Sequence, residues 1–145
     1  MATLRILIAE DNRAVREGLR EFLEAQPEWQ VVGEAVNGME AVEKSRELQP
    51  EVVILDYSMP QLDGISAAAR IRQASPQTEL LVLTQHDAPY TARRALDAGV
   101  RGYVVKSDAD RDLLAAVEAV SRHKVFVSSS IAQDVSLERG RSSNA

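Results

Sequence analysis

The sequence contains no cysteine, and among its 145 residues it has only one tryptophan, three tyrosines and two phenylalanines. The absence of cysteine excludes disulfide bonds, thiol catalysis and cysteine-ligated metal sites. Long hydrophobic runs are missing too, since runs such as residues 52–55 are far shorter than the roughly 20 apolar residues of a membrane-spanning helix. No secretory signal is evident, because Glu10 interrupts the first apolar run. These absences predict a cytoplasmic protein with no membrane partner.

Basic charge is also scarce, because 17 Lys and Arg residues face 22 Asp and Glu residues and leave a net charge of −5. An acidic chain with few aromatics is a poor candidate for binding nucleic acid by itself, since neutralisation of phosphates supplies most such affinity. The 45% of apolar and 27% of charged residues are near the averages of globular proteins. The length corresponds to about one domain.

Five short apolar runs alternate with helical stretches along the chain. The expected strands are residues 4–9, 31–36, 52–55, 80–83 and 102–105. Most of them are continuous rather than alternating, which is typical of parallel strands covered on both faces. Helical patterns between them indicate βαβ units with right-handed crossovers. The sequence therefore predicts an α/β, flavodoxin-like doubly wound (βα)5 sandwich with a five-stranded parallel sheet of order 2-1-3-4-5.

Polar residues stand directly at the carboxyl ends of four expected strands, where ligands bind in open α/β sheets. They are Glu10 and Asp11, Asp56, Thr84 and Lys106. Each also has an ordinary structural interpretation. Asp11 or Asn12 can cap the first helix, and Asp56 can serve a turn. Only the combination favours a functional site.

The combination has an electrostatic cost. Because neighbouring strands lie about 4.8 Å apart, the carboxylates of Asp11 and Asp56 are expected some 5 Å from each other, with Glu10 close by. Two like charges at that distance repel by about 3 kcal/mol at an effective dielectric constant of 20. A divalent cation removes this repulsion. Magnesium fits best, because it takes oxygen ligands and prefers phosphate oxygens as further ligands.

Lys106 and Thr84 complete a set of groups suited to phosphoryl transfer. Lys106 lies two strands from Asp56, or roughly 10 Å, and its flexible stem can bring an ammonium into the site. Thr84 can offer a hydroxyl donor. Phosphoryl transfer depends on positioning and charge stabilisation, and carboxylates can form acyl phosphates. The sequence therefore predicts Asp56 as the nucleophile.

An ordered set of motifs resembles the receiver domain of bacterial two-component response regulators from residue 4 to about residue 122. The motifs are Ile8-Ala9-Glu10-Asp11, Asp56 with Met59-Pro60 and Gly64, Leu83-Thr84, and residues 102–106. Two stretches, residues 83–87 and 94–103, look most like the NarL/FixJ (LuxR-type) branch. Single motifs are weak signals, but the ordered set is specific.

The resemblance implies a role for each residue of the acidic cluster. Asp56 would accept a phosphoryl group from a sensor histidine kinase. Asp11 and Asp56 would bind Mg²⁺ directly, together with the backbone carbonyl of Ser58, and Glu10 would act through a water molecule. The chain would then catalyse only phosphoryl transfer to Asp56 and slow hydrolysis from it, and would not be an enzyme of metabolism.

The resemblance also implies a switch. Lys106 would pair with the phosphoryl group, Thr84 would move to hydrogen-bond it, and Tyr103 would change rotamer in step with Thr84. Ser58 and His86 stand at positions that tune the lifetime of the phosphate in this family. The kinase would dock near the first helix and the loop after the fifth strand, and phosphorylation would allow a homodimer to form.

Members of this branch usually carry a helix-turn-helix DNA-binding domain after the receiver, but only 23 residues follow Arg122. We therefore expect a receiver domain over residues 1–122 and a C-terminal extension over residues 123–145 that leads toward an absent output domain. Within the extension, a short helix is expected from Ser128 through Leu137. DNA would be contacted only through the absent domain. A natural single-domain receiver is the alternative.

Two other function classes compete with the phosphorylated switch. Haloacid-dehalogenase-type phosphatases carry a second aspartate two residues after the nucleophile, where this chain has Ser58. A receiver-like interaction module that never takes phosphate is the stronger competitor.

Gln85 departs from the receiver pattern. Many receivers have a small residue after the threonine, and a larger residue there narrows access to Asp56. A glycine-rich phosphate loop is missing after the first strand, which disfavours a nucleotide-binding protein.

Overall fold

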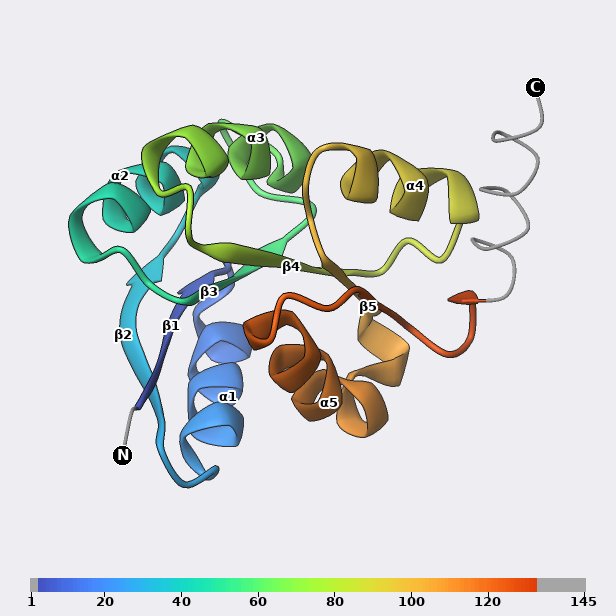
Figure 1. Cartoon of the computed structure of the whole chain (residues 1–145), viewed down its shortest axis with the longest axis horizontal. Helices are drawn as coiled ribbons and strands as arrows, with labels where there is room; N and C mark the ends of the chain where they lie inside the picture. The colour runs from blue at the N-terminus through green and yellow to red at the C-terminus, as the bar shows by residue number, and fades with distance from the viewer. Residues whose placement is uncertain (1–2, 133–145) are drawn as a thin grey trace.

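Strands and helices alternate along residues 3–132, the part of the chain that the computed structural model describes (Figure 1). The strands are β1 (Leu4–Ala9), β2 (Trp29–Ala35), β3 (Val52–Asp56), β4 (Glu79–Thr84), β5 (Gly102–Val105) and β6 (Phe126–Val127). The helices are α1 (Arg13–Glu24), α2 (Gly38–Leu48), α3 (Gly64–Ala74), α4 (Pro89–Asp97) and α5 (Ala109–Ser121), with a 3₁₀ turn η1 (Lys106–Asp108). None of the described helices is long and apolar enough to cross a membrane.

The strands form one parallel sheet of order β2-β1-β3-β4-β5-β6. This confirms the predicted doubly wound fold and its strand order. Helices α2, α3 and α4 cover one face of the sheet, and α1 and α5 cover the other (Figure 1). The sheet is thus sandwiched between two helical layers, which explains why its central strands consist of continuous aliphatic runs.

Each strand supplies side chains to two separate hydrophobic cores. On β1, Leu7 and Ala9 face the layer of α2 and α3, whereas Ile6 and Ile8 face the layer of α1 and α5. Because successive strand residues point to opposite faces, a strand buried on both sides has no polar alternation. Because the strands are parallel, their carboxyl ends lie at the same edge of the sheet. The residues that directly follow these ends therefore share that edge.

The sixth strand, β6, is a feature that the sequence pattern did not predict. After α5 the chain turns at His123, which has a φ of 65°, and then runs beside β5. The amide of Ser128 donates to the carbonyl of Tyr103 over 2.9 Å. The side chains of Ser128 and Ile131 are buried. Residues 126–131 therefore pack against the sheet, while most of the helix predicted from Ser128 through Leu137 lies outside the described residues.

Candidate functional site

The predicted polar residues lie together at the carboxyl edge of the sheet. Glu10 and Asp11 follow β1, Asp56 ends β3, Thr84 ends β4, and Lys106 follows β5. Because β1 has β2 on one side and β3 on the other, this edge contains the point where the strand order reverses. Ligands bind at such points in open α/β sheets.

Three carboxylates meet at this edge. One oxygen each of Glu10, Asp11 and Asp56 lies within 4.8 Å of the others. Glu10 and Asp56 are only 3% and 7% exposed, whereas Asp11 is open to solvent. Asp11 is free for the cluster because Asn12 caps α1 instead, accepting a 3.0 Å hydrogen bond from the amide of Val15. The spacing agrees with the distance expected from neighbouring strands.

Burial and like charge together disturb the ionisation of Glu10. Desolvation by burial is the main cause that raises the pKa of Glu10 to about 8, and the adjacent, negatively charged carboxylate of Asp56 raises it further. Lys106 opposes this shift. Within residues 3–132, the buried Oε2 of Glu10 has no hydrogen-bond partner. A buried acceptor without a donor, set among carboxylates, fits a bound cation or its water shell.

Lys106 is the nearest cation of this cluster. Its Nζ lies 3.4 Å from Asp56 Oδ1 and 3.8 Å from Glu10 Oε1. The lysine stem therefore spans the two-strand gap, as the sequence predicted. One ammonium against three carboxylates leaves the cluster negative when all are ionised, so further positive charge is needed to balance it.

The loop after β3 folds back closely on Asp56. The amide of Ser58 donates to Asp56 Oδ1 over 3.3 Å. A Cβ added to Gly64 would lie 2.8 Å from the carbonyl oxygen of Asp56, so the start of α3 can approach the strand only with glycine there. The close approach keeps the loop compact beside the carboxylates. The predicted use of the Ser58 carbonyl as a metal ligand stays a prediction.

On the β4–β5 side, Thr84 and Tyr103 are fully buried and share one partner. Thr84 Oγ1 accepts a 3.0 Å hydrogen bond from the amide of His86, and the Tyr103 hydroxyl donates to the carbonyl of His86 over 2.9 Å. Burial is the main cause that raises the pKa of Tyr103 to about 12. The two predicted switch residues are therefore joined through the backbone of His86, whose ring packs edge-on against Tyr57 at 4.9 Å.

Sequence reasoning missed one residue that supports this side of the site. The Ser128 hydroxyl accepts a 2.8 Å hydrogen bond from the amide of Val105, directly before Lys106. Ser129 and Ser130 bind Asp112 and Asp108, which follow Lys106 in the chain. The segment after α5 is thus tied to both sides of Lys106. A serine triplet after an apolar run carries no signal for such a contact.

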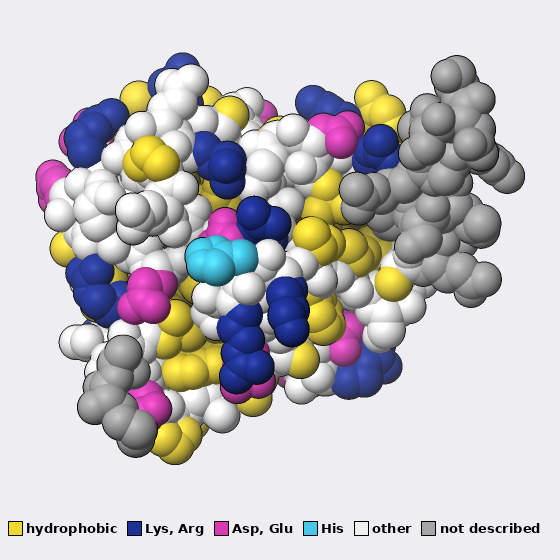
Figure 2. Space-filling view, in the orientation of Figure 1, with side chains coloured by type: hydrophobic (Ala, Val, Ile, Leu, Met, Phe, Trp, Pro, Cys, Tyr) yellow, Lys and Arg dark blue, Asp and Glu magenta, His cyan; other side chains and the backbone are white. Residues whose placement is uncertain are grey.

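The surface beside the site offers an apolar groove. A groove of about 290 Å³ lies between α1 and α5 and is lined in part by Leu19, Phe22, Leu113 and Lys106. Figure 2 shows basic and acidic side chains interspersed over the displayed face. The groove adjoins the site through Lys106, and it lies in the region where the sequence resemblance places the kinase.

Comparison with known proteins gives consistent matches over most of the chain. Residues 6–118 match the sequence model of the response regulator receiver domain. The response regulator protein VraR of Staphylococcus aureus is 37% identical over 120 residues, which cover 83% of this chain and 57% of VraR. The chain therefore spans a little over half the length of the curated relatives that it matches.

Solved structures agree with these sequence matches. The crystal structure of a LuxR-family two-component response regulator from an Aurantimonas species has a TM-score of 0.90 and 37% identity, covering 95% of this chain and 99% of that one. The isolated receiver domain of RcsB from Salmonella enterica serovar Typhimurium, determined with the phosphomimetic BeF3−, has a TM-score of 0.82 and 30% identity. That match covers 90% of this chain and 97% of the RcsB domain.

Proposed function

Because this chain belongs to the response regulator receiver domain family, with LuxR-type relatives, we propose that it is the phosphoacceptor of a two-component system, with Asp56 as the phosphorylated residue. One observation carries the proposal. The carboxylate of Asp56 is buried within 4.8 Å of two other carboxylates, and an ammonium lies 3.4 Å away. Such a cluster has little structural value without a cation and an anionic partner.

Mg²⁺ is the proposed cofactor of this site. Asp11, Asp56 and the Ser58 carbonyl would hold it directly, and Glu10 would hold one of its waters. The unpartnered Glu10 oxygen and the raised pKa of Glu10 support this assignment, because both express a missing positive charge. When bound, the ion neutralises the cluster and draws phosphoryl oxygens toward Asp56.

The reaction is a displacement at phosphorus. A carboxylate oxygen of Asp56 bonds to the phosphorus of a phosphohistidine in a sensor kinase, and the phosphorus–nitrogen bond breaks, so that the kinase imidazole leaves and an acyl phosphate forms. Lys106 is placed to stabilise the phosphoryl oxygens, since its Nζ already contacts Asp56. Slow attack by water returns Asp56, at a rate that we expect Ser58 and His86 to influence.

The switch acts through the β4–β5 side of the site. When the Thr84 hydroxyl turns to the phosphoryl group, it gives up its hydrogen bond from the His86 amide. Because His86 also accepts from Tyr103, this rearrangement favours a different rotamer of Tyr103. The phosphoryl group thereby selects one of two packings of α4, β5 and α5.

The output of the switch is transcription control in the proposed function. We propose residues 1–122 as the receiver and residues 123–145 as an extension toward a DNA-binding output domain, with residues 126–131 of the extension packed against the receiver sheet. RcsB, a relative of 30% identity, has been solved as dimers bound to DNA, which supports a homodimer, and we propose that phosphorylation of Asp56 favours its formation. The net charge of −5 makes DNA binding by these 145 residues alone unfavourable. The cytoplasm is the proposed location, because a sensor kinase of this kind would transfer its phosphoryl group there.

Intact-protein mass spectrometry after incubation with acetyl phosphate, with and without Mg²⁺, tests the proposal. We expect one phosphate adduct on the wild type in Mg²⁺ and none on Asp56→Asn. Asp63→Asn is a matched control, because Asp63 caps α3 outside the site and asparagine also caps helices well. Absence of an adduct on wild-type protein that binds Mg²⁺ would instead favour an interaction module that takes no phosphate.

A further inference from the structure

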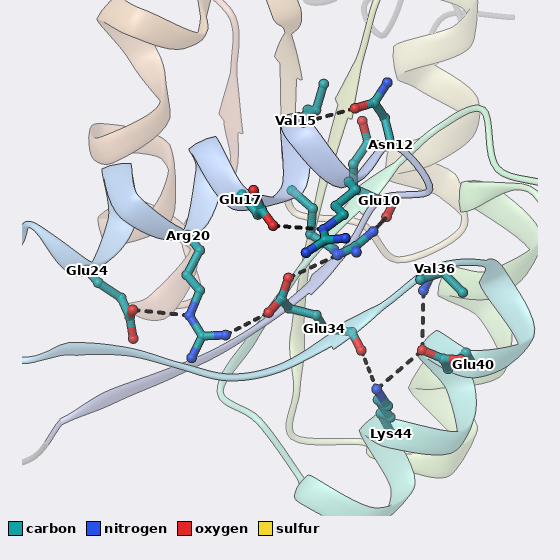
Figure 3. Close-up of polar contacts among 12 residues, drawn as sticks. Glu10, Asn12, Val15, Glu17, Arg20, Glu24, Glu34, Val36, Glu40 and Lys44 are labelled. Carbon is teal, nitrogen blue, oxygen red and sulfur yellow. Dashed lines mark hydrogen bonds and ion pairs between the residues drawn. The ribbon is translucent and has the colours of Figure 1, made fainter.

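A network of charged side chains joins α1, β2 and α2 and reaches the end of β1 at Glu10 (Figure 3). Glu34 on β2 accepts from two arginines of α1. Arg16 Nε lies 2.9 Å from Glu34 Oε1, and Arg20 Nη1 lies 2.6 Å from Glu34 Oε2. Both arginines therefore neutralise the same carboxylate.

Only one of these arginines also reaches the turn that carries the metal-binding carboxylates. Arg16 Nη1 donates to the backbone carbonyl of Glu10 over 2.9 Å, whereas Arg20 pairs with Glu24 at 3.2 Å on the outer side of α1. The side chain of Arg16 is 14% exposed and that of Arg20 is 44% exposed. Arg16 is thus a partly buried bridge, and Arg20 is a surface partner.

The backbone of Glu10 is held at both of its polar groups, by β2 at the amide and by Arg16 at the carbonyl. The Glu10 amide donates to the carbonyl of Ala35 on β2 over 3.0 Å, and the Glu10 carbonyl accepts from Arg16. Rotation of the peptide between Glu10 and Asp11 would move both carboxylates at once. Since the three carboxylates repel one another, a restraint on this peptide is needed to keep them converging on one point.

Glu34, the β2 residue that Arg16 contacts, is held in turn by α2. Lys44 of α2 donates to the backbone carbonyl of Glu34 and pairs with Glu40 at 3.2 Å (Figure 3). The chain of contacts therefore runs from α2 through β2 and α1 to the end of β1. The planar guanidinium of Arg16 donates from Nε and Nη1 to two different acceptors, which the compact ammonium of lysine does less well.

We propose that Arg16 is a positioning residue for the metal site: through the carbonyl of Glu10 it holds Glu10 and Asp11 in the arrangement that binds Mg²⁺. This inference rests on the proposed function, because it assumes that the acidic cluster takes the ion. Groups that orient metal ligands from behind typically contribute about 10- to 100-fold to metal affinity. Arg16 acts on the backbone rather than on a ligand atom, so we expect an effect of about tenfold.

Isothermal titration with MgCl2 on the full chain tests the inference with Arg16→Gln, Arg16→Lys and Arg20→Gln. Arg20→Gln is the matched control, because it removes an ion pair with the same Glu34 but no bond to Glu10. We expect the Mg²⁺ dissociation constant to rise about tenfold in Arg16→Gln, to rise less in Arg16→Lys, and to stay unchanged in Arg20→Gln. Saturating Mg²⁺ should restore the phosphorylation rate of Arg16→Gln.

Equal weakening in Arg16→Gln and Arg20→Gln would overturn the inference, since it would assign the effect to the shared pair with Glu34. If Arg16→Gln fails to fold, Arg16→Lys decides: it keeps the positive charge, and wild-type Mg²⁺ affinity in this variant would overturn the inference. Absence of Mg²⁺ binding by the wild type would overturn the proposed metal site itself. A positioning role that is separate from stability requires that Mg²⁺ affinity and thermal stability rank the variants differently.

Discussion

Two buried glutamates at opposite edges of the sheet have opposite surroundings. Glu10, 3% exposed, follows β1 at the carboxyl edge, and Glu79, 5% exposed, begins β4 at the other edge. Glu79 Oε2 lies 2.5 Å from Arg101 Nε and 2.8 Å from His123 Nδ1. The carboxylate of Glu10 faces two other carboxylates, and within the described chain the cation that pairs with it is Lys106, at 3.8 Å.

The difference shows how a structural charge is told apart from a functional one. Burying a carboxylate costs several kcal/mol unless charge and hydrogen bonds compensate for lost water. Near Glu79 the chain supplies the opposite charge itself through Arg101, and a ring nitrogen of His123 supplies a hydrogen bond. Near Glu10 the chain supplies part of this compensation, and burial together with Asp56 raises the pKa of Glu10 to about 8. In the proposed function, a bound cation would supply the compensation that Glu10 lacks.

The largest expected effect separates the two edges by their response to Mg²⁺. At a Mg²⁺ concentration of 100 times its dissociation constant, the ion should stabilise the fold by about 2.7 kcal/mol. Asp11→Asn should lose most of this gain, whereas Glu79→Gln should keep it, because Glu79 lies outside the acidic cluster. Differential scanning calorimetry with MgCl2 or EDTA measures the gain. Equal Mg²⁺ stabilisation in Asp11→Asn would break the distinction between the edges.

Glu79→Gln should destabilise the protein by about 2 kcal/mol, because it leaves Arg101 without its counter-charge. The cost stays below that of a fully buried pair, since the side chain of Arg101 is 39% exposed. Urea unfolding without Mg²⁺ measures the change in the free energy of unfolding. Glu118→Gln, on the exposed face of α5, is the control and should change that free energy by less than about 0.5 kcal/mol.

Glu10→Gln should have the opposite sign and stabilise the Mg²⁺-free protein above pH 8, where Glu10 is ionised beside Asp56. The pKa of Glu10 in the fold, about 8, exceeds its ordinary value of 4.5. Its contribution to stability is therefore fully present below pH 4.5 and is lost as the pH rises through about 8. Thermal melts in EDTA across this range should show a decline that is weaker in Glu10→Gln. A parallel decline in the variant would assign the pH dependence to other groups.

The smallest effect concerns the outer partner of Glu79. The side chain of His123 is 71% exposed, and exposed ion pairs contribute little. His123→Gln should therefore lower the free energy of unfolding by less than about 0.5 kcal/mol at pH 7. Urea unfolding beside Glu79→Gln makes the comparison. A loss as large as that of Glu79→Gln would mean that His123, rather than Arg101, compensates the buried carboxylate.

Much of the fold was accessible from the sequence because its signals are local. The predicted bounds of β1 and β5 are confirmed, and their continuous aliphatic residues pack into both cores. β4 begins one residue earlier than predicted, at Glu79, because charged residues are not expected at buried strand positions. β6 was missed, since a strand of two residues has no periodicity of its own and depends on pairing with β5.

The candidate site was also predictable only in part. Its carboxylates, Thr84 and Lys106 could be placed together from the strand order alone, because residues that end parallel strands share an edge. Hydrogen bonds made by the backbone could not be placed in this way. The link through His86 and the bond from Arg16 to the Glu10 carbonyl depend on side-chain directions, which the order of the strands leaves open.

The sequence by itself determined which residues line the carboxyl edge, because alternating strands and helices, right-handed crossovers and apolar runs leave few arrangements. Only the tertiary structure decided which buried charge is compensated. Arg101 and His123 lie far from Glu79 in the sequence. They contact it only when β4, β5 and the turn after α5 are packed together. Electrostatic compensation depends on distances of a few ångströms across the folded chain, and these distances exist only once the layers have come together.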